Sequence, residues 1–324
     1  MPLSPRTTGT LAAVVTVALW TGFIIVGRAS VSHTLLPFDL ALVRLGGAAV
    51  VTVPWALWLT RPGGPAHGSA SLWGLSPLPL RQTAWAGLFG GLLYSVLCYA
   101  GFFYAPAAHA SVLMPGSLPL WAGFLAVPIL GERLTRARAL ALGCIALGGL
   151  VVGGASLRTA WAGGAVWKGD LIFVSAAFCW SMYGVLARRF ALDAVRATIA
   201  ITAFGALCYV PFFVLGTALG WLPSRLHQAP WGEVIAQALF QGLGLVVLAG
   251  ITFVVMIRCF GPVRTTMLTA LVPGLSALGA VALLGEPLGW NLIVGLVLVT
   301  AGILLGVKAP APARGDPALQ EVTP

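Results

Sequence analysis

The sequence predicts an all-α membrane protein with ten transmembrane helices, arranged as two inverted five-helix repeats around a central cavity. Three observations lead to this prediction: the composition, the spacing of long apolar runs, and an internal repeat. Of the 324 residues, 59% are hydrophobic and only 8% are charged, whereas a soluble domain carries roughly 25% charged residues. Such a surface could not stay in water, which excludes an ordinary soluble enzyme, a nucleic-acid-binding protein and a disordered chain.

Ten apolar runs along the chain have the length of a bilayer-crossing helix, which needs about 20 residues. The runs are Gly9–Gly27, Leu40–Leu59, Trp85–Tyr104, Ala107–Leu130, Ala139–Leu157, Leu171–Ala187, Ala197–Leu219, Val234–Ile257, Met267–Leu284 and Leu288–Val307. Of all the charged residues, only Arg44 lies inside a run. Because charges are costly in hydrocarbon, this exclusion is the strongest sign of a membrane protein.

The basic residues predict the orientation of the chain. With both termini in the cytoplasm, the inner connections carry 13 lysines and arginines and the outer connections carry 4. This asymmetry follows the positive-inside rule, and it explains the net charge of +10 without an anionic partner such as nucleic acid. We therefore expect a multi-pass protein of the cell inner membrane with cytoplasmic N- and C-termini.

The connecting segments are distinct in composition. Residues 60–82 are rich in Pro, Gly and Ser and predict a loop, and residues 309–324 contain four prolines and predict a disordered cytoplasmic tail. The five cysteines are widely spaced in apolar surroundings, so they predict small buried residues and no disulfide framework.

The chain repeats itself. A shift of 154 places Leu130-Gly131-Glu132-Arg133-Leu134 on Leu284-Gly285-Glu286-Pro287-Leu288, and a shift of 160 places Trp20 on Trp180 and Arg28 on Arg188. Residues 9–157 therefore form a first repeat of five spans, and residues 168–307 a second. Because five is odd, the second repeat enters from the opposite face, which is the architecture of many secondary transporters.

These motifs resemble the drug/metabolite transporter superfamily, in its EamA-type branch with ten spans and two EamA repeats. The resemblance rests on the two Leu-Gly-Glu segments, each preceded by a proline in the same span, and on the Pro37-Phe38-Asp39…Arg44 start of the second span. It implies a carrier of small metabolites or drugs, often an exporter. Span seven has no counterpart of Arg44, so no role of this arginine carries over to the second repeat.

Glu132 and Glu286 are predicted to belong to structural turns rather than to carry protons. Each follows a glycine, Gly131 or Gly285, that suits the C-terminal end of a helix. Each then precedes the next helix, whose positive dipole end favours a carboxylate.

Spans four and nine contain proline next to glycine in their interiors, at related places in the two repeats. Proline frees backbone carbonyls, and such breaks persist in a membrane where protein or a water-filled cavity satisfies them. The residues are candidates for the flexing walls of the central cavity, with a merely kinked structural helix as the alternative. They are Pro115, Gly116 and Pro119 in span four, and Pro273 and Gly274 in span nine.

Two ionisable residues within the spans have open roles. Arg44 lies about 6 Å below the outer start of span two, at 1.5 Å per residue. It either extends to the interface or pairs with a neighbouring helix, or it binds a substrate carboxylate. His109 lies near the outer end of span four; it is either a packed, hydrogen-bonded residue, or a substrate contact or proton site.

The remaining candidates for substrate contacts are aromatic and polar residues on helical faces. Each one alone is also compatible with ordinary packing, but as a set they describe a polar, uncharged cavity with aromatic walls. Gln237 and Gln241 lie one turn apart and should point inward, because an unpaired amide facing lipid is expensive. The set is Trp20, Tyr94, Tyr99, Met114, Trp121, Trp180, Tyr183, Gln237 and Gln241.

The sequence lacks a phosphate-binding GxxxxGK[ST] loop and the spacings typical of zinc sites, so no ATPase motor, metal or other cofactor is expected. We predict a secondary transporter of alternating-access type that exports small neutral or zwitterionic metabolites, such as amino acids or amphipathic drugs. A proton-coupled antiporter that uses His109 is the main alternative; a channel and an intramembrane enzyme are further ones. The expected partners are a small-molecule substrate and the lipid bilayer; the oligomeric state stays open, with a monomer as one option.

Overall fold

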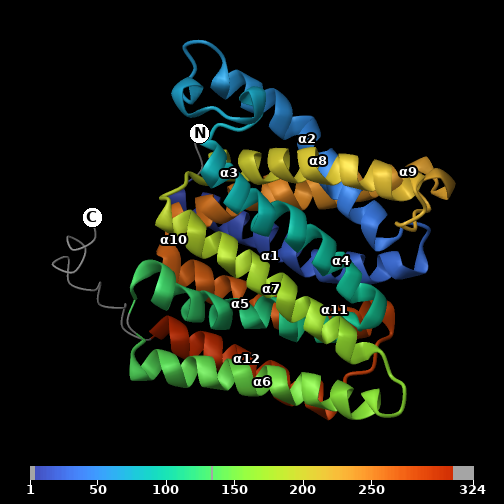
Figure 1. The fold of residues 1–324 in the computed structure, drawn as a ribbon. Coiled ribbons are helices and arrows are strands. Elements are labelled where there is room, and N and C mark those ends of the chain that lie inside the picture. The colour runs from blue at the N-terminus through green and yellow to red at the C-terminus, as the bar shows by residue number, and fades with distance from the viewer. Residues whose placement is uncertain (1–3, 133, 309–324) are drawn as a thin grey trace.

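The protein is a bundle of long helices in the computed structural model, which describes residues 4–132 and 134–308 (Figure 1). Ten helical stretches in these ranges are long and apolar enough to cross a membrane. The same ranges contain no β-strand, only an isolated bridge between Ser71 and Ser76. The predicted fold class and number of spans are therefore confirmed. The prediction for the tail, residues 309–324, lies outside the described residues.

Most spans are single helices, whereas the third and eighth are composed of three consecutive helical segments. The helical segments of the spans, in chain order and without the short 3-10 turns of the connections, are α1 (Pro5–Ala29), α2 (Pro37–Thr60), α3 (Leu80–Ala86), η4 (Gly87–Leu93), α4 (Tyr94–Tyr104), α5 (Ala107–Leu130), α6 (Arg136–Ala160), α7 (Val166–Arg189), α8 (Ala194–Ala218), α9 (Trp231–Gln237), η6 (Ala238–Leu248), α10 (Ala249–Thr269), α11 (Leu271–Leu284) and α12 (Trp290–Lys308).

The helices extend beyond the apolar runs at several ends, because only the middle of a membrane helix must be apolar. The sixth run begins at Leu171, whereas α7 already begins at Val166 and so includes Lys168 and Asp170. A helical stretch of 24 residues spans more than the hydrocarbon core, so charged residues at its ends reach the interface.

The segments η4 and η6 are π-helical and occupy corresponding places in the two repeats, in the third span of each. A π-helix widens the turn and re-aims the side chains that follow it, and such segments are frequent at functional sites. Tyr94 directly follows η4, and Gln241 lies within η6. The two irregular segments therefore position two of the predicted site residues.

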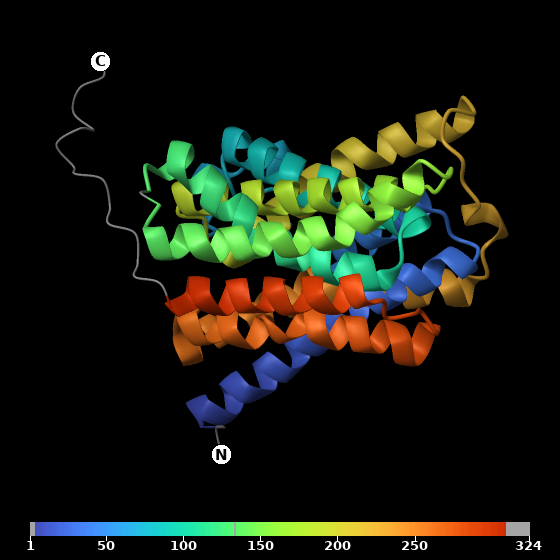
Figure 2. The same ribbon diagram turned by 90° about the horizontal axis from the view of Figure 1, so that it is seen from below.

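The helices of the two repeats interleave in the centre, while α6 and α12 lie side by side at one edge of the bundle (Figures 1 and 2). In the centre, α2 crosses η6 at very short range. A Cβ atom on Gly47 would lie 2.5 Å from the carbonyl oxygen of Ala238. Small residues allow such close approach between membrane helices, and this contact joins the first repeat to the second.

Both Leu-Gly-Glu segments end a helix in the same way. Gly131 and Gly285 have left-handed φ angles of 67° and 66° at the ends of α5 and α11. The next amide in each case, that of Glu132 or Glu286, donates to a carbonyl six residues back. Glycine takes a left-handed φ without steric cost, which explains its place here.

Candidate functional site

Arg44 forms the centre of a buried polar and aromatic cluster. Its side chain projects from α2, and the residue is only 7% exposed. Its guanidinium carbon lies 5.6 Å from the ring centre of Phe23 and 5.7 Å from that of Tyr94, and Nη1 donates to the hydroxyl of Tyr99 at 3.4 Å. We call Phe23, Arg44, Tyr94, Tyr99 and Gln241 the Arg44 cluster. It joins α1, α2, α4 and η6.

A chain of hydrogen bonds runs from the cluster to the far end of α1. The hydroxyl of Tyr99 donates to Oε1 of Gln241 at 2.9 Å, and Nε2 of Gln241 donates to Oε1 of Gln237 at 3.2 Å. Nε2 of Gln237 then donates to Oγ of Ser30 at 2.9 Å. Along this chain, each side chain accepts a hydrogen bond from the neighbour nearer to Arg44 and donates one to the next. No donor faces another donor, so all of these hydrogen bonds can form at once.

Arg44 has no carboxylate partner among the described residues, whose ion pairs all involve other cations. Removing a charge from water without a counter-charge is expensive. The two aromatic faces offset part of this cost through cation–π attraction, which is worth roughly 0.5–2 kcal/mol. The position therefore offers an unneutralised positive charge to an anionic group of a ligand.

The aromatic wall of the cluster continues onto α7. The ring centres of Tyr94 and Trp180 are 4.7 Å apart, and those of Trp180 and Tyr183 are 5.2 Å apart. The structure thus brings together seven of the residues that the sequence predicted as substrate contacts. They are Arg44, Tyr94, Tyr99, Trp180, Tyr183, Gln237 and Gln241.

Other predicted contacts lie elsewhere in the bundle. Trp121 packs against Phe124 and Phe178, and Phe124 is 67% exposed on the outside of the bundle. Trp20 packs on Phe253 of α10, with 5.2 Å between the ring centres. Met114 is buried in the core. None of these three predicted residues has a ring contact or hydrogen bond with the Arg44 cluster in the described part of the chain.

His109 belongs to a second buried polar group, between α5, α6 and α7. Its Nδ1 lies 2.8 Å from Oδ1 of Asp170, and Oγ of Ser156 donates to Oδ2 of Asp170 at 2.5 Å. Asp170 is 5% exposed. The sequence-based view that Arg44 and His109 are the only ionisable groups within the spans, apart from Tyr and Cys, is therefore wrong. Asp170 shares a helical face with the buried Phe173 and Ala177, which is the signal that could have revealed it.

The interior prolines have different effects in the two repeats. The α-helix of α5 continues through Pro115 and Pro119, whereas a break at Ala270, just ahead of Pro273, separates α10 from α11. Gly116 faces Val299 of α12, and Gly274 faces open space. The flexing of these segments stays a prediction.

Glu286 connects the two repeats at the face predicted to be outside. It forms an ion pair with Nε of Arg28 at 3.0 Å, and its two oxygens accept the amides of Ala107 and Ala108 at 3.0 Å each. The expectation that Glu286 interacts with the helix that follows it is wrong, because its carboxylate caps the start of α5 instead. The first amides of a helix have no partner within the helix, and the positive end of its dipole attracts a carboxylate.

Glu132 forms the corresponding ion pair at the opposite face. It pairs with Arg188 of α7 and with Nη1 of Arg138 at 3.4 Å. Each repeat therefore supplies the arginine for the glutamate of the other repeat. The sequence carried the signal, because the internal shifts already matched Arg28 with Arg188 and Glu132 with Glu286. We call Arg28–Glu286 the outer latch and Arg188–Glu132 the inner latch.

The hydrated central cavity stays a prediction, because the Arg44 cluster is closed in this structure. Tyr99 and Gln241 are fully buried. Two pockets, of about 270 and 480 Å³, lie at other places. One is between α3 and α7, and the other is beside α8 and α9. In the described ranges, no three His, Cys, Asp or Glu side chains are grouped in a way that could hold a metal ion.

Two sequence comparisons indicate a transporter, and a structural comparison shows a shared fold. The sequence matches the profile of the EamA-like transporter family over residues 7–154 and 167–307. It is 26% identical over 242 residues to the "Uncharacterized transporter YyaM" of Bacillus subtilis (strain 168), covering 71% of this chain and 75% of that protein. A solved structure, titled only "Crystal structure of protein", shares the fold with a TM-score of 0.58 and 23% identity. That match covers 92% of this chain and 96% of the solved one.

Proposed function

The chain belongs to the EamA-like transporter family and is a multi-pass membrane transporter, and from this premise we propose its substrate class and mechanism. The protein is a secondary transporter of alternating-access type, located in the cell inner membrane. It moves small zwitterionic organic solutes that carry one carboxylate, such as amino acids, and Arg44 binds that carboxylate. Export is the direction that the resemblance to its family favours.

One observation carries this proposal: a buried guanidinium that has aromatic and hydroxyl neighbours but no carboxylate partner among the described residues. A guanidinium presents its donors in a planar fork that matches a carboxylate. The faces of Tyr94 and Trp180 would attract an ammonium group through cation–π interaction. One cation fits one carboxylate, whereas sugar phosphates or nucleotide sugars would need several.

The closed cluster fits the alternating-access mechanism. The only side-chain hydrogen bond of Arg44 among the described residues is a long one, from Nη1 to the hydroxyl of Tyr99 at 3.4 Å, so the other guanidinium donors are open to a substrate carboxylate. Paired hydrogen bonds between the guanidinium and a substrate carboxylate, in which both partners are charged, favour the state that holds substrate. Substrate shifts the equilibrium between the inward-open and outward-open states only if it binds one of them more tightly than the other.

The test is counterflow in proteoliposomes with the full-length protein. Radiolabelled amino acids and their uncharged carboxamide analogues would be compared for the wild type, Arg44→Gln and Arg44→Lys. We expect saturable counterflow of at least one amino acid. Arg44→Gln should weaken its affinity at least tenfold, which corresponds to about 1.4 kcal/mol, while carboxamide affinity changes little.

Two outcomes contradict the proposal. Unsaturable flux without counterflow would indicate a channel. Equal loss of amino-acid and carboxamide transport in Arg44→Gln, in a protein that remains monodisperse, would show that Arg44 is structural. Arg258→Gln, which removes an exposed arginine of α10, is the matched control for lost charge.

A second candidate, proton-coupled antiport, has its own supporting observation. His109 and Asp170 form a buried pair with Ser156, and histidine side chains serve as proton carriers in many proteins. Substrate transport would be measured in liposomes with and without a pH gradient, for wild type, His109→Gln and Asp170→Asn. Coupling predicts accumulation driven by the gradient in the wild type and none in either variant. Equal accumulation with and without the gradient would reject it.

A further inference from the structure

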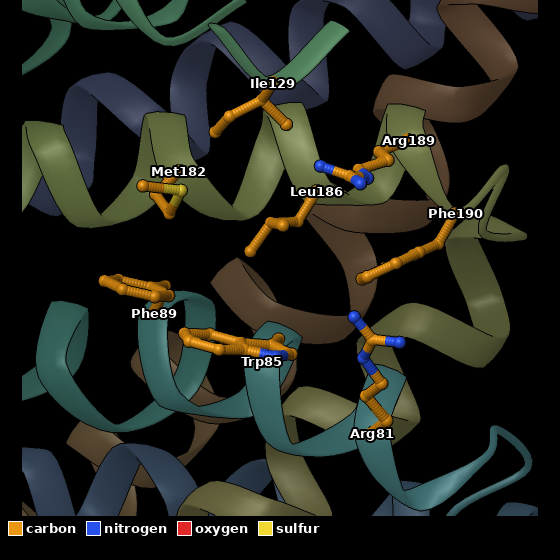
Figure 3. Close-up of a pocket in the computed structure, with 8 residues that line it drawn as sticks. All are labelled: Arg81, Trp85, Phe89, Ile129, Met182, Leu186, Arg189 and Phe190. Carbon is orange, nitrogen blue, oxygen red and sulfur yellow. The ribbon is translucent and has the colours of Figure 1, made fainter. Parts of the chain in front are cut away.

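A narrow groove lies between α3 and α7, on the face where both helices have basic ends. It encloses about 270 Å³ and is closed on a third side by Ile129, near the end of α5 (Figure 3). Its walls are apolar, with aromatic and aliphatic side chains in equal number. The lining residues besides Ile129 are Arg81, Trp85, Phe89, Met182, Leu186, Arg189 and Phe190.

The groove opens to the outside of the bundle. Trp85, which lies on one wall, is 45% exposed and stacks on Phe89 with nearly parallel rings, 6.0 Å apart. Behind this wall, Phe89 contacts Phe178, which in turn contacts Trp121. In a membrane-spanning helix, an exposed aromatic wall faces lipid, so acyl chains can reach the groove.

The two arginines stand at the rim. Arg81 projects from the first turn of α3 and Arg189 from the last turn of α7, and Figure 3 shows them at the same end of the groove as Phe190. Both are exposed, and neither forms an ion pair with any residue that the structure describes. Their positions at helix ends place them at the level of the membrane interface.

We propose that this groove binds one anionic phospholipid. The phosphate lies between the guanidinium groups of Arg81 and Arg189, and an acyl chain lies along the wall of Trp85 and Phe89. Guanidinium binds phosphate through paired donors, and basic pockets between membrane helices on the cytoplasmic side are suited to anionic headgroups. A free phosphate ion would use only the rim and gain nothing from the apolar walls.

The pocket beside α8 and α9 lacks this combination of apolar walls and basic side chains. It is larger, at about 480 Å³, but its lining contains no lysine or arginine. Its residues are Phe213, Thr217, Leu222, Ser224, Leu226, His227 and Trp231. The groove between α3 and α7 thus combines apolar walls with two unpaired cations, which the larger pocket lacks. The proposal requires only that the protein lies in a membrane, and it is independent of the transported substrate.

The first test measures lipid binding to the delipidated full-length protein in detergent by native mass spectrometry. Phosphatidylglycerol and phosphatidylcholine with the same acyl chains serve as probes. The double variant Arg81→Gln/Arg189→Gln should bind phosphatidylglycerol at least fivefold more weakly than the wild type. Arg6→Gln/Arg258→Gln removes two exposed arginines with no ion pair in the described ranges, and it should bind like the wild type. Equal phosphatidylglycerol binding by both double variants would overturn the proposal.

The second test separates a lipid from a free anion. Met182→Trp fills the groove while both arginines remain, and it should reduce phosphatidylglycerol binding at least fivefold. Ile293→Trp, at a 46% exposed position of α12, is the matched control and should leave binding unchanged. Unchanged binding in Met182→Trp would overturn the acyl-chain site. Displacement of phosphatidylglycerol by an equal concentration of inorganic phosphate would show an anion site and also overturn the proposal.

Discussion

Tyr99 is the residue that links the buried cation to the amide chain of η6. Its hydroxyl accepts a hydrogen bond from Arg44 and donates one to Gln241. Tyr99 is fully buried, so no water reaches this oxygen from outside the bundle. A phenylalanine here would keep the ring packing but would leave an acceptor and a donor unpaired inside the bundle. The site thus depends on one oxygen atom.

Tyr99→Phe should therefore lower the free energy of unfolding by about 1–3 kcal/mol, the cost of unsatisfied buried polar groups. It should also change substrate affinity, because Arg44 loses its only side-chain hydrogen bond among the described residues. Reversible unfolding in mixed SDS and mild detergent measures the stability. Tyr104→Phe, at a 45% exposed position of the same helix, is the control and should change neither quantity.

At this scale the sequence could identify candidates but not their neighbours. The two glutamines were predicted to face inward because an unpaired amide avoids lipid, and they hydrogen-bond to each other. Tyr94 was predicted as part of an aromatic wall, and its ring lies against Arg44. The separation of Trp121 from them depends on how α5 and α7 are rotated. A single sequence contains little information on helix rotation, since aromatic residues suit both lipid-facing and interior positions.

At the scale of elements, the contact of α2 with η6 depends on the absence of a side chain. A Cβ atom on Gly47 would lie 2.5 Å from a carbonyl oxygen of the other helix, whereas one on the adjacent Gly46 would have no atom within 4 Å. The two glycines therefore serve as a natural pair for comparison. Only one of them permits the close approach.

We expect Gly47→Ala to destabilise the fold by about 1–3 kcal/mol, because the helices must move apart. Gly46→Ala should leave stability unchanged or raise it, since alanine favours a helix over glycine by roughly 1 kcal/mol. The same unfolding measurement in SDS and mild detergent compares both variants. Equal destabilisation by the two would show that helix contact is not the cause.

The outer latch predicts a local change in dynamics. Glu286→Gln removes the charge that holds Arg28 and weakens the caps on the amides of Ala107 and Ala108. A loss of about 1–3 kcal/mol would raise amide exchange at the start of α5 roughly 5- to 150-fold. Hydrogen–deuterium exchange read by mass spectrometry measures this change.

Glu132→Gln is the symmetry-related control for that prediction. It removes the inner latch at the opposite face and should leave exchange at Ala107 and Ala108 as in the wild type. A rise in both variants would mean that the two latches are not independent. No rise in Glu286→Gln would mean that the carboxylate does not hold the start of α5.

Element ends were partly predictable. The glycines of the two Leu-Gly-Glu segments marked the ends of α5 and α11, because a left-handed φ is a local requirement. The π-helices were not predicted, since the apolar runs of these two spans have no pattern that distinguishes a π-helix from an α-helix. The start of α7 was placed too late because Lys168 and Asp170 were assigned to a loop on account of their charge.

For the whole molecule, the asymmetry of basic residues predicts that both chain termini face the cytoplasm. Green fluorescent protein fused after Lys308 should be fluorescent, and alkaline phosphatase fused there should be inactive. Phosphatase inserted after Arg225, in the connection between α8 and α9, should be active. The opposite pattern would reverse the assignment of the two faces and of both latches.

The number of spans and the two-repeat architecture were predictable because they follow from hydrophobicity and from a count of helices. The interleaving of the two repeats was not predictable. The internal repeat matched the arginines with each other and the glutamates with each other, but it did not show which arginine contacts which glutamate. Only the folded chain shows that each arginine reaches the glutamate of the other half.

The reciprocal latches also bear on how such a chain could have arisen. In the present chain, Arg28 and Arg188 each reach the glutamate of the other half. Two copies of a half-length ancestor inserted in opposing directions would form both ion pairs at once, the arginine of each on the glutamate of its sister. Gene fusion would then preserve an assembly that already existed as an antiparallel homodimer.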